Sequence, residues 1–380
     1  MTRTTKATMA TYPTILISCG EASGDLHAAA LVTEILKRNP DARIIAFGGD
    51  RVAQAGAELV SHIDRYAVMG FSSVLASITK FARLEKKLRS VLRNGVDLFI
   101  PVDYPGLNIR LSGYAKKLGV PVLYYISPQV WAWGAGRIRE IGRSVDRIAV
   151  ILPFEEEIYK REGIPVEYVG HPFVEDHYLP EPVTESEREG VGLLPGSRLQ
   201  EIRRILPVLL GAARYITERR PGTRFVIGRH PTVPLYSYEK VLTRFGMDIP
   251  IDNDAVAVMR RSRAILVASG TATLQGALFE TPLVIVYRIS AINYLLARKL
   301  VKIRNIGLVN IIFNDGVCPE FIQSSAVPER IGKKALELID DNDSRRIMVD
   351  RFKSLKHTLS GGGGCRRVAE ISEEMLRKRR

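Results

Sequence analysis

A carboxylate and an arginine are the first residues of this sequence that suggest chemistry. In Pro101-Val102-Asp103-Tyr104-Pro105, the acid Asp103 directly follows an apolar run. A carboxylate at the end of a strand, beside a cleft, is suited to act as a general base. An aspartate in the same setting is also a common turn cap. The local residues leave both interpretations of Asp103 open.

The arginine belongs to Gly192-Leu193-Leu194-Pro195-Gly196-Ser197-Arg198, in the middle of the chain. This motif ends a predicted strand, breaks at its Pro-Gly pair and opens a predicted helix, Leu199–Arg220. A turn of this kind presents free backbone N–H groups and the positive end of a helix dipole. Ser197 adds a hydroxyl and Arg198 a guanidinium, a combination that suits a phosphate or diphosphate. An ordinary strand-to-helix turn with a surface arginine explains the same residues.

A second loop of this type follows the predicted strand Ala264–Ala268. It reads Ser269-Gly270-Thr271-Ala272-Thr273-Leu274-Gln275, and Arg288 ends the next predicted strand, Pro282–Tyr287. We therefore predict a nucleoside-diphosphate pocket built from both loops. Its expected contacts are Gly196, Ser197, Ser269, Gly270, Thr271, Thr273, Gln275 and Arg288. The sequence has no G-x-x-x-x-G-K-[ST] motif and no cluster with metal-ligand spacing, so neither a P-loop nor a metal is expected.

Two polar segments in the first half are candidates for substrate recognition. Gly20-Glu21-Ala22-Ser23-Gly24-Asp25-Leu26-His27 follows the first predicted strand, and its glutamate favours hydroxyl or sugar recognition over phosphate. Ser23 and His27 are the expected contacts there, while a capped helix start is the structural alternative. Ser127-Pro128-Gln129-Val130-Trp131-Ala132-Trp133 contains both tryptophans. Trp131 and Trp133 suit a sugar-stacking surface, an acyl pocket or a core corner.

The elements around these segments alternate between strand-like and helix-like patterns. Nearly continuous apolar runs predict parallel strands covered on both faces, at Thr14–Cys19, Arg43–Gly48, Asp97–Val102, Val120–Ile126, Arg147–Leu152 and Val166–Val169. Helices are expected between them, including Asp25–Arg38, Ser77–Arg93 and Asn108–Leu118. This order predicts a doubly wound α/β sheet, in which ligands bind beyond the carboxyl ends of the strands.

The length of 380 residues favours two domains over one. We expect a disordered tail at 1–12, an N-terminal Rossmann-like domain at 13–180 and a second one at 190–345. Helices at 346–380 either return to the N-terminal domain or contact a second subunit. The glycine run at 361–364 marks a hinge or a close chain crossing.

The net charge of +14 indicates an anionic partner, although a basic surface can also serve solubility alone. Met69–Phe81, which contains Phe71, continues into a helix whose apolar residues alternate with lysines and arginines. It predicts either a basic helix lying on lipid or a core-facing helix, and Arg298–Arg304 has the same two interpretations. The three isolated cysteines are typical of a reducing cytosol, and no nucleic-acid module accompanies the charge.

Taken in order, several of these motifs resemble one family. They are Gly20-Glu21-Ala22-Ser23-Gly24-Asp25, Ser127-Pro128-Gln129-Val130-Trp131-Ala132-Trp133, Leu152-Pro153-Phe154-Glu155, Gly170-His171-Pro172, Leu194-Pro195-Gly196-Ser197-Arg198 and Ala268-Ser269-Gly270-Thr271-Ala272-Thr273. Together they resemble the lipid-A-disaccharide synthase family from Thr14 to the end of the sequence. The resemblance implies an inverting, metal-independent glycosyltransferase with two Rossmann-like domains facing a cleft, the GT-B arrangement. It implies no cofactor.

The implied reaction joins two acylated sugars. It transfers 2,3-diacylglucosamine from UDP-2,3-diacylglucosamine to 2,3-diacylglucosamine 1-phosphate, forming a β-1,6-linked disaccharide 1-phosphate and UDP. By resemblance, Asp103 is the essential aspartate and candidate base, Arg198 holds the donor diphosphate, and Glu21 is an important acid. Asn310 and Glu320 match polar positions near the donor. Such a protein would lie on the inner face of the cytoplasmic membrane, and a homodimer is left open.

The sequence departs from the family pattern at four positions. Gly106 stands where an aspartate is usual, Gly134 and Asp315 where arginines are usual, and Gln275 where a glutamate is expected. Gln275 can still exchange hydrogen bonds with ribose hydroxyls. Another UDP-sugar transferase or a UDP-sugar epimerase of the same fold is the alternative function, because a fold does not fix an activity.

Overall fold

The computed structural model describes residues 12–66, 74–129, 131, 136, 138–175, 180–290, 294, 305–340 and 343–379. The chain forms two units. The first extends to Pro172 and also takes in Gly361–Arg380, and the second is Phe173–Ser360. The boundary between the units, after Pro172, thus falls before the end of the first domain expected from the sequence at residue 180.

The first unit is built on a seven-stranded, fully parallel sheet with the strand order β3-β2-β1-β4-β5-β6-β7. Its strands are β1 (Thr14–Cys19), β2 (Arg43–Gly48), β3 (Glu58–His62), β4 (Leu98–Val102), β5 (Leu123–Tyr125), β6 (Arg147–Val150) and β7 (Val166–Tyr168). The order reverses between β1 and β4, which pair in register from Ile15↔Leu98 to Cys19↔Val102. A crevice for a ligand is expected at such a reversal, at the carboxyl ends of the two strands.

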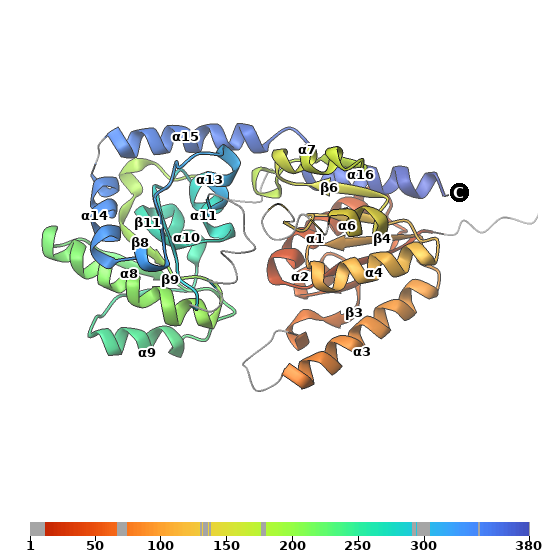
Figure 1. The fold of residues 1–380 in the computed structure, drawn as a ribbon, viewed down its shortest axis with the longest axis horizontal. Coiled ribbons are helices and arrows are strands. Elements are labelled where there is room, and N and C mark those ends of the chain that lie inside the picture. The colour runs from red at the N-terminus through yellow and green to blue at the C-terminus, as the bar shows by residue number, and fades with distance from the viewer. Residues whose placement is uncertain are drawn as a thin grey trace, which may run out of the picture. The chain divides into compact units, whose positions relative to one another are not determined.

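Helices cover both faces of this sheet (Figure 1). One layer contains α3 (Val74–Arg93), α4 (Pro105–Lys117), α6 (Ile138–Ser144) and α7 (Pro153–Arg161). The other contains α1 (Ala22–Arg38), α2 (Asp50–Gln54) and α16 (Gly364–Arg377), with α1 packed against both of its neighbours. Because both faces are covered, β1 and β4 consist almost entirely of buried residues.

The last helix, α16, is fixed to the first unit by ion pairs. Arg367 contacts Glu167 on β7 at 2.5 Å and Glu374 on its own helix at 2.9 Å. Arg147 on β6 also binds Glu374, at 2.9 Å. The glycine run before the helix crosses β7 so closely that a Cβ atom at Gly362 would lie 1.9 Å from the carbonyl carbon of Val169. Of the two interpretations of this run, the structure shows the close crossing.

The second unit repeats the design with six parallel strands in the order β10-β9-β8-β11-β12-β13. They are β8 (Glu189–Leu194), β9 (Phe225–Gly228), β10 (Ile251–Asp252), β11 (Ser262–Ala268), β12 (Leu283–Tyr287) and β13 (Glu320–Ile322). The order reverses between β8 and β11, so this sheet has its own candidate crevice. Both candidate anion loops follow these two strands.

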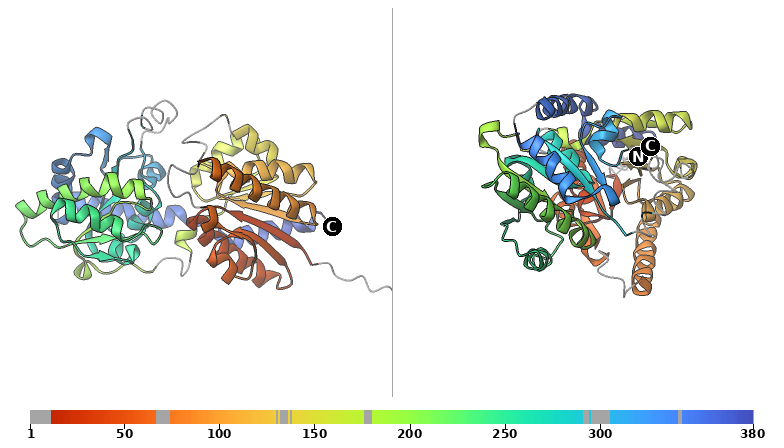
Figure 2. Two further views of the ribbon diagram at one scale, coloured as in Figure 1. Left: turned by 90° about the horizontal axis from the view of Figure 1, so that it is seen from below. Right: turned by 60° about the vertical axis from the view of Figure 1, so that its left-hand side comes forward.

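The helices of the second unit are α8 (Leu199–Arg219), α9 (Tyr236–Phe245), α10 (Ala255–Arg261), α11 (Thr271–Leu278), α13 (Leu308–Phe313), α14 (Pro328–Ile339) and α15 (Asp343–Leu359). α8 packs against α9 and α14, while α11 packs against α10, α13 and α15. Figure 2 shows each sheet between its own helices. Helix α15, expected with the C-terminal segment 346–380, belongs to this second unit. No helix in the described ranges has the length and apolar character needed to cross a bilayer.

Candidate functional site

Asp103 lies at the carboxyl end of β4, where the chain makes a tight left-handed turn. Both Asp103 and Tyr104 have positive φ angles, 48° and 51°. This conformation is costly for residues with side chains and persists only where surrounding contacts enforce it. The Tyr104 ring lies against Gly20, so a Cβ at position 20 would be 2.3 Å from ring atoms. The glycine after β1 thus makes room for the turn after β4.

Asn108, on the first turns of α4, holds this left-handed turn in place. Its side-chain amide donates to the carbonyl oxygens of Asp103 at 2.7 Å and of Ser18 at 3.0 Å. The Ser18 hydroxyl donates back to Asn108 Oδ1 at 2.7 Å, and the Tyr124 hydroxyl donates to the Asp103 carbonyl at 2.8 Å. Asn108 and Ser18 are fully buried. The carbonyl of Asp103 is therefore held by side chains from α4 and β5, and Ser18 of β1 holds Asn108 in turn.

The carboxyl group of Asp103 has an electrostatic environment suited to a base near neutral pH. Burial, together with the nearby Glu21 carboxylate, raises its pKa to about 6, and a hydrogen bond from the Tyr104 N–H opposes the increase. A second acid, Glu155 on α7, is 2% exposed. Burial raises the pKa of Glu155 to about 7, with Asp103 adding to the increase. Three acids, Glu21 after β1, Asp103 after β4 and Glu155 after β6, thus lie near one another.

The segment after β1 contains both exposed and buried residues. Glu21 and Ser23 are exposed, whereas His27 is 6% exposed and burial lowers its pKa to about 4. His27 is thus a buried, neutral residue, and its contact with the acceptor stays a prediction. Asp25 does not cap α1. It accepts hydrogen bonds from Gly49 N at 2.6 Å and Arg51 N at 3.2 Å, and so caps α2.

Trp131 is half-buried and is occupied by protein contacts. Its Nε1 donates to Glu155 Oε1 at 3.0 Å, and its ring meets Phe154 edge-on with centroids 5.2 Å apart. Glu155 also accepts a hydrogen bond from Leu152 N at 3.2 Å. Of the sugar-stacking, acyl-pocket and core interpretations, these contacts favour the core for Trp131, whose side chain there positions α7. Trp133 and Gly134 lie outside the described residues.

A pocket of about 400 Å³ opens beside the Asp103 turn. It is lined by Glu21 after β1, Phe81 of α3, and Tyr104, Pro105, Gly106, Leu107 and Arg110 around the start of α4. Apart from Glu21 and Arg110, these side chains are apolar or aromatic. Position 106, where the family pattern has an aspartate, faces open space, since a Cβ there would meet nothing within 4 Å. The pocket is therefore lined by apolar side chains together with one acidic and one basic side chain.

In the second unit, the turn after β8 has the expected shape but not the expected free donors. Gly196 has a φ of 116°, and Arg198 directly precedes α8. The Glu201 carboxylate accepts from Ser197 N at 2.8 Å and Arg198 N at 3.2 Å. The prediction of free N–H groups is therefore wrong for these two amides, because the helix caps itself. The Arg198 side chain is 69% exposed, with its guanidinium 3.7 Å from Glu201.

The loop after β11 presents fewer side chains than its sequence suggested. Gly270 and Thr271 are exposed and Gln275 is half-buried. Thr273 is fully buried and its hydroxyl donates to Gly270 O at 2.8 Å. Its contact with the nucleotide stays a prediction. Ser269 is partly exposed and donates to Ile306 O at 2.9 Å. Arg288 follows β12 and is exposed.

Asn310 and the half-buried Glu320 form a hydrogen-bonded support for the neighbouring segment. Asn310 is fully buried and donates to Glu320 Oε1 at 2.7 Å. Glu320 also accepts from the backbone N–H groups of Ile306 at 2.9 Å and Gly307 at 3.0 Å. The pair thereby fixes the segment that Ser269 contacts. Asp315, the departure from an expected arginine, lies 3.4 Å from Arg351.

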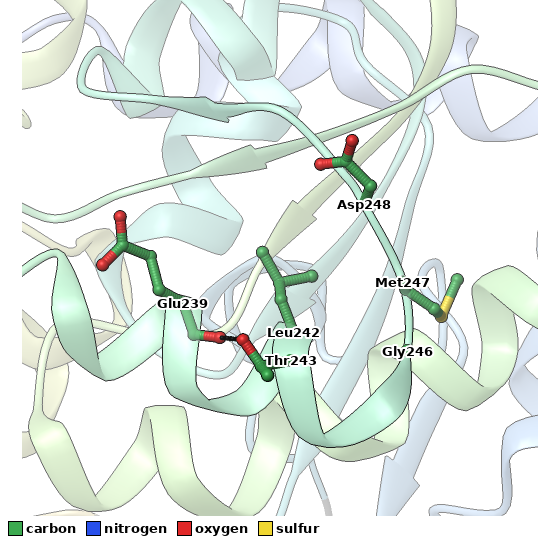
Figure 3. A pocket seen from close by; sticks show the side chains of 6 residues that line it. All are labelled: Glu239, Leu242, Thr243, Gly246, Met247 and Asp248. Carbon is green, nitrogen blue, oxygen red and sulfur yellow. Dashed lines mark hydrogen bonds between the residues drawn. The ribbon is translucent and has the colours of Figure 1, made fainter.

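Several predicted residues lie outside the described ranges, namely Met69, Phe71 and Arg298–Arg304. A further pocket of about 400 Å³ lies at the end of α9 and includes Glu239, Thr243 and Asp248 (Figure 3). It precedes β10, at the amino end of the strands, opposite the edge where ligands of such sheets bind. Among the described residues, no group of His, Cys, Asp or Glu side chains is arranged to hold a metal ion.

Sequence reasoning missed Tyr104, Asn108, Glu155 and Arg110. Tyr104 and Asn108 depend on the left-handed turn, which has no clear sequence signal when neither residue in it is glycine. Glu155 belongs to the motif Leu152-Pro153-Phe154-Glu155, but nothing in the sequence indicated its burial. Arg110 is one of many cations, and only the fold brings it to the pocket wall.

The chain matches known proteins over nearly its whole length. The model of the lipid-A-disaccharide synthetase family matches residues 15–373. A lipid-A-disaccharide synthase of Nitrosococcus oceani is 40% identical over 376 residues, covering 96% of each chain. Among solved structures, the glycosyltransferase of kitacinnamycin has a TM-score of 0.66 at 16% identity, covering 96% of this chain and 100% of its own.

A UDP-GlcNAc 2-epimerase from Neisseria meningitidis has a TM-score of 0.60 at 13% identity, covering 96% of this chain and all of its own. Because structures of both kinds match at low identity, they establish the fold and do not separate a transferase from an epimerase. The family model and the relative at 40% identity make that distinction. The chain belongs to the lipid-A-disaccharide synthetase family of glycosyltransferases.

Proposed function

We propose that the protein transfers 2,3-diacylglucosamine from UDP-2,3-diacylglucosamine to 2,3-diacylglucosamine 1-phosphate. The products are a β-1,6-linked disaccharide 1-phosphate and UDP. Family membership supports the choice of reaction. The observation that carries it is the Asp103 carboxyl, held at a strand end and with its pKa raised to about 6. A carboxyl with this pKa is largely ionised at pH 7 yet more basic than an ordinary aspartate.

The transfer is an inverting displacement in which each bond change has a residue assigned to it. Asp103 accepts the proton of the acceptor 6-hydroxyl as its oxygen forms a bond to C1 of the donor sugar. The C1–O bond to the diphosphate breaks, and its electron pair leaves with UDP. Attack from the face opposite the diphosphate inverts C1 and gives the β-linkage. Negative charge accumulates on the leaving diphosphate, where a fixed cation lowers the barrier.

Arg198 is the cation we assign to the leaving diphosphate. Arg198 directly precedes α8, its guanidinium is exposed, and Gly196 and Ser197 form the turn before it. Ser269, Gly270, Thr271 and Gln275 around α11, with Arg288 after β12, are the further donor contacts in this proposal. Asn310 and Glu320 support the segment at Ile306 and remain in the proposal as polar positions near the donor. Ser23 and Glu21 are assigned to the acceptor side.

The test follows product formation by mass spectrometry with both acylated substrates. Wild-type protein is expected to form disaccharide and UDP in equal amounts. Asp103→Asn keeps the shape but removes the base, and should slow the reaction by about 10²- to 10⁴-fold. Asp97→Asn is the matched control, since Asp97 precedes β4 at its opposite end and accepts from Thr14 N at 2.9 Å. Equal rates for wild type and Asp103→Asn would contradict the proposal, as would UDP release without acceptor.

Arg198 is tested by the binding of UDP alone. Arg198→Gln should weaken UDP binding by about 10- to 100-fold, the usual range for loss of a charge-assisted contact. Arg203→Gln removes an exposed charge from the same helix and should leave UDP binding unchanged. Isothermal titration calorimetry gives both dissociation constants. Equal weakening by the two variants would show a general charge effect and exclude a specific role for Arg198.

We also propose peripheral attachment to the inner face of the cytoplasmic membrane. The acylated substrates and the basic, exposed residues Lys80, Arg83, Lys86 and Lys87 of α3 support this location. Co-sedimentation with anionic vesicles should fall when Phe71 and Leu75 are changed to Ser. Ile347→Ser on α15, which removes a side chain from a 62% exposed position, is the control. Unchanged sedimentation of the double variant would rule out the Phe71 and Leu75 side chains as the membrane contact.

A further inference from the structure

The pocket beside Asp103 has a preformed apolar wall. Phe81 contacts Tyr66 with ring centroids 5.7 Å apart, and Tyr66 meets Phe47 edge-on at 5.6 Å. Phe47 is fully buried in the core of the first unit. Phe81 is therefore connected to the core by a continuous series of rings. Leu107, 2% exposed, forms the part of the wall contributed by α4.

Arg110 is the cation that lines this pocket. Its Nε binds Glu85 Oε2 at 3.0 Å, and Glu85 also binds Arg89 at 2.6 Å. Two guanidinium groups share one carboxylate, so the cluster keeps one net positive charge. Within the described part of the chain, the Arg110 guanidinium makes no other hydrogen bond, and its side chain is 54% exposed. The terminal nitrogens remain available to an anion.

The pocket is lined by one acid, Glu21, and one cation, Arg110. Asp103 directly precedes the lining residue Tyr104, and burial together with the Glu21 charge raises the pKa of Asp103 to about 6. Arg110 lies five residues beyond Pro105 in α4, which corresponds to about 7.5 Å along the helix axis. A phosphate monoester would be repelled by the carboxylates and attracted to the guanidinium.

We propose that Arg110 binds the phosphate of a phosphorylated, acylated hexosamine whose 6-hydroxyl lies at Asp103. In this orientation the sugar ring lies between Glu21 and Tyr104, and the first atoms of its acyl chains contact Phe81 and Leu107. Arg110 therefore selects the phosphorylated acceptor over the same lipid with a free 1-hydroxyl. This inference rests on the proposed function, because it assigns the acceptor of the same reaction.

The experiment measures kcat and KM with two acceptors, diacylglucosamine 1-phosphate and diacylglucosamine with a free 1-hydroxyl. Wild-type protein should prefer the phosphorylated lipid in kcat/KM. In Arg110→Gln this preference should fall by about 10- to 100-fold, mainly through the KM of the phosphorylated acceptor. The KM of the UDP-sugar should not change. Arg110→Lys keeps the charge but loses the guanidinium geometry, and should restore part of the preference.

Arg93→Gln is the matched control, since it removes an exposed charge from α3 at a residue outside both the pocket lining and the Glu85 ion pairs. It should leave the preference between acceptors unchanged. If Arg110→Gln still prefers the phosphorylated acceptor as strongly as wild type does, the inference is overturned. Disaccharide formation by wild-type protein in the same experiment still supports the proposed function. An equal decrease for both acceptors also overturns the inference. If wild-type protein forms no disaccharide from either lipid, both proposals are wrong.

Discussion

The side-chain amide of Asn108 donates a 2.7 Å hydrogen bond to the main-chain carbonyl of Asp103, across the left-handed turn that ends β4. The same amide binds Ser18 O at 3.0 Å. One buried side chain therefore joins the ends of β1 and β4, the two strands at which the sheet order reverses. The position of the proposed base depends on this bridge as much as on Asp103 itself.

Replacing Asn108 with Ala should reduce both stability and kcat. The change leaves the carbonyls of Ser18 and Asp103 short of buried hydrogen bonds, which costs about 2–4 kcal/mol in the free energy of unfolding. The KM for the UDP-sugar should stay the same. Ser112→Ala removes one buried hydroxyl from the same helix, which donates to Asn108 O at 2.8 Å, and should cost only about 1 kcal/mol without changing kcat. Urea denaturation and initial rates test both. Full kcat in folded Asn108→Ala would refute the positioning role.

The pH dependence of kcat/KM should show an acid limb with an apparent pKa near 6, because protonated Asp103 cannot accept the acceptor's proton. Activity should therefore rise with pH through this value. Glu21→Gln removes a neighbouring negative charge and should move the limb to lower pH. Glu34→Gln, on the helix α1 that follows Glu21, is the control and should not move the limb, because Glu34 pairs with Lys37 at 2.5 Å. If Glu21→Gln does not change the apparent pKa of the acid limb, the Glu21 charge does not raise the pKa of Asp103.

Replacing Gly362 with Ala should strongly destabilise the first unit. The added Cβ would meet the backbone of Val169 at 1.9 Å, and neither chain can move without disturbing β7 or α16. A cost of about 3 kcal/mol or more is expected in the free energy of unfolding. Gly113→Ala in α4 meets nothing within 4 Å and should stabilise by about 0.5–1 kcal/mol. A neutral Gly362→Ala would show that the crossing is looser than described.

Acid should destabilise the first unit through its buried histidines. Burial lowers the pKa of His27 to about 4 and of His171 to about 3, below the value of about 6.5 expected in the unfolded chain. Between these values the unfolded state binds more protons, so stability falls as pH decreases from 6.5. His27→Gln should reduce the loss between pH 7 and pH 5 by about 2 kcal/mol.

The measurement is the difference between His27→Gln and wild type in urea denaturation at the two pH values. Asp103 and Glu155, whose raised pKa values act in the opposite direction, contribute equally to both proteins and cancel. His62→Gln on β3 controls for loss of an imidazole from the same unit. If the His27→Gln difference does not change with pH, burial does not perturb this histidine as described.

The apolar strands could be predicted from the sequence because parallel strands buried on both faces leave a simple pattern. β1 and β2 have the predicted bounds, Thr14–Cys19 and Arg43–Gly48. The strands β3, β10 and β13 were not predicted, because they are short edge strands with mixed polarity. Edge strands are buried on fewer sides and carry a weaker hydrophobic signal.

For the site, the sequence indicated which residues could act but not how each is held. Asp103 could be assigned to a strand end because the apolar run before it is clear. The self-capping of α8 by Glu201 was not foreseen, since a glutamate at that position also fits a solvent-facing first turn. Thr273 and Asn310 have polar side chains, yet the fold uses them internally. Composition does not distinguish a polar side chain that binds a ligand from one that satisfies the backbone.

The return of Gly361–Arg380 to the first unit has a consequence for synthesis. The ribosome completes Phe173–Ser360 before it makes α16, so the second unit has all of its sequence while the first still lacks a helix that covers α1 and bonds to β6 and β7. The part of the chain translated first is thus the last to acquire its full set of contacts. For the same reason, the second unit can be expressed as one uninterrupted fragment, whereas the first requires its two pieces to be spliced.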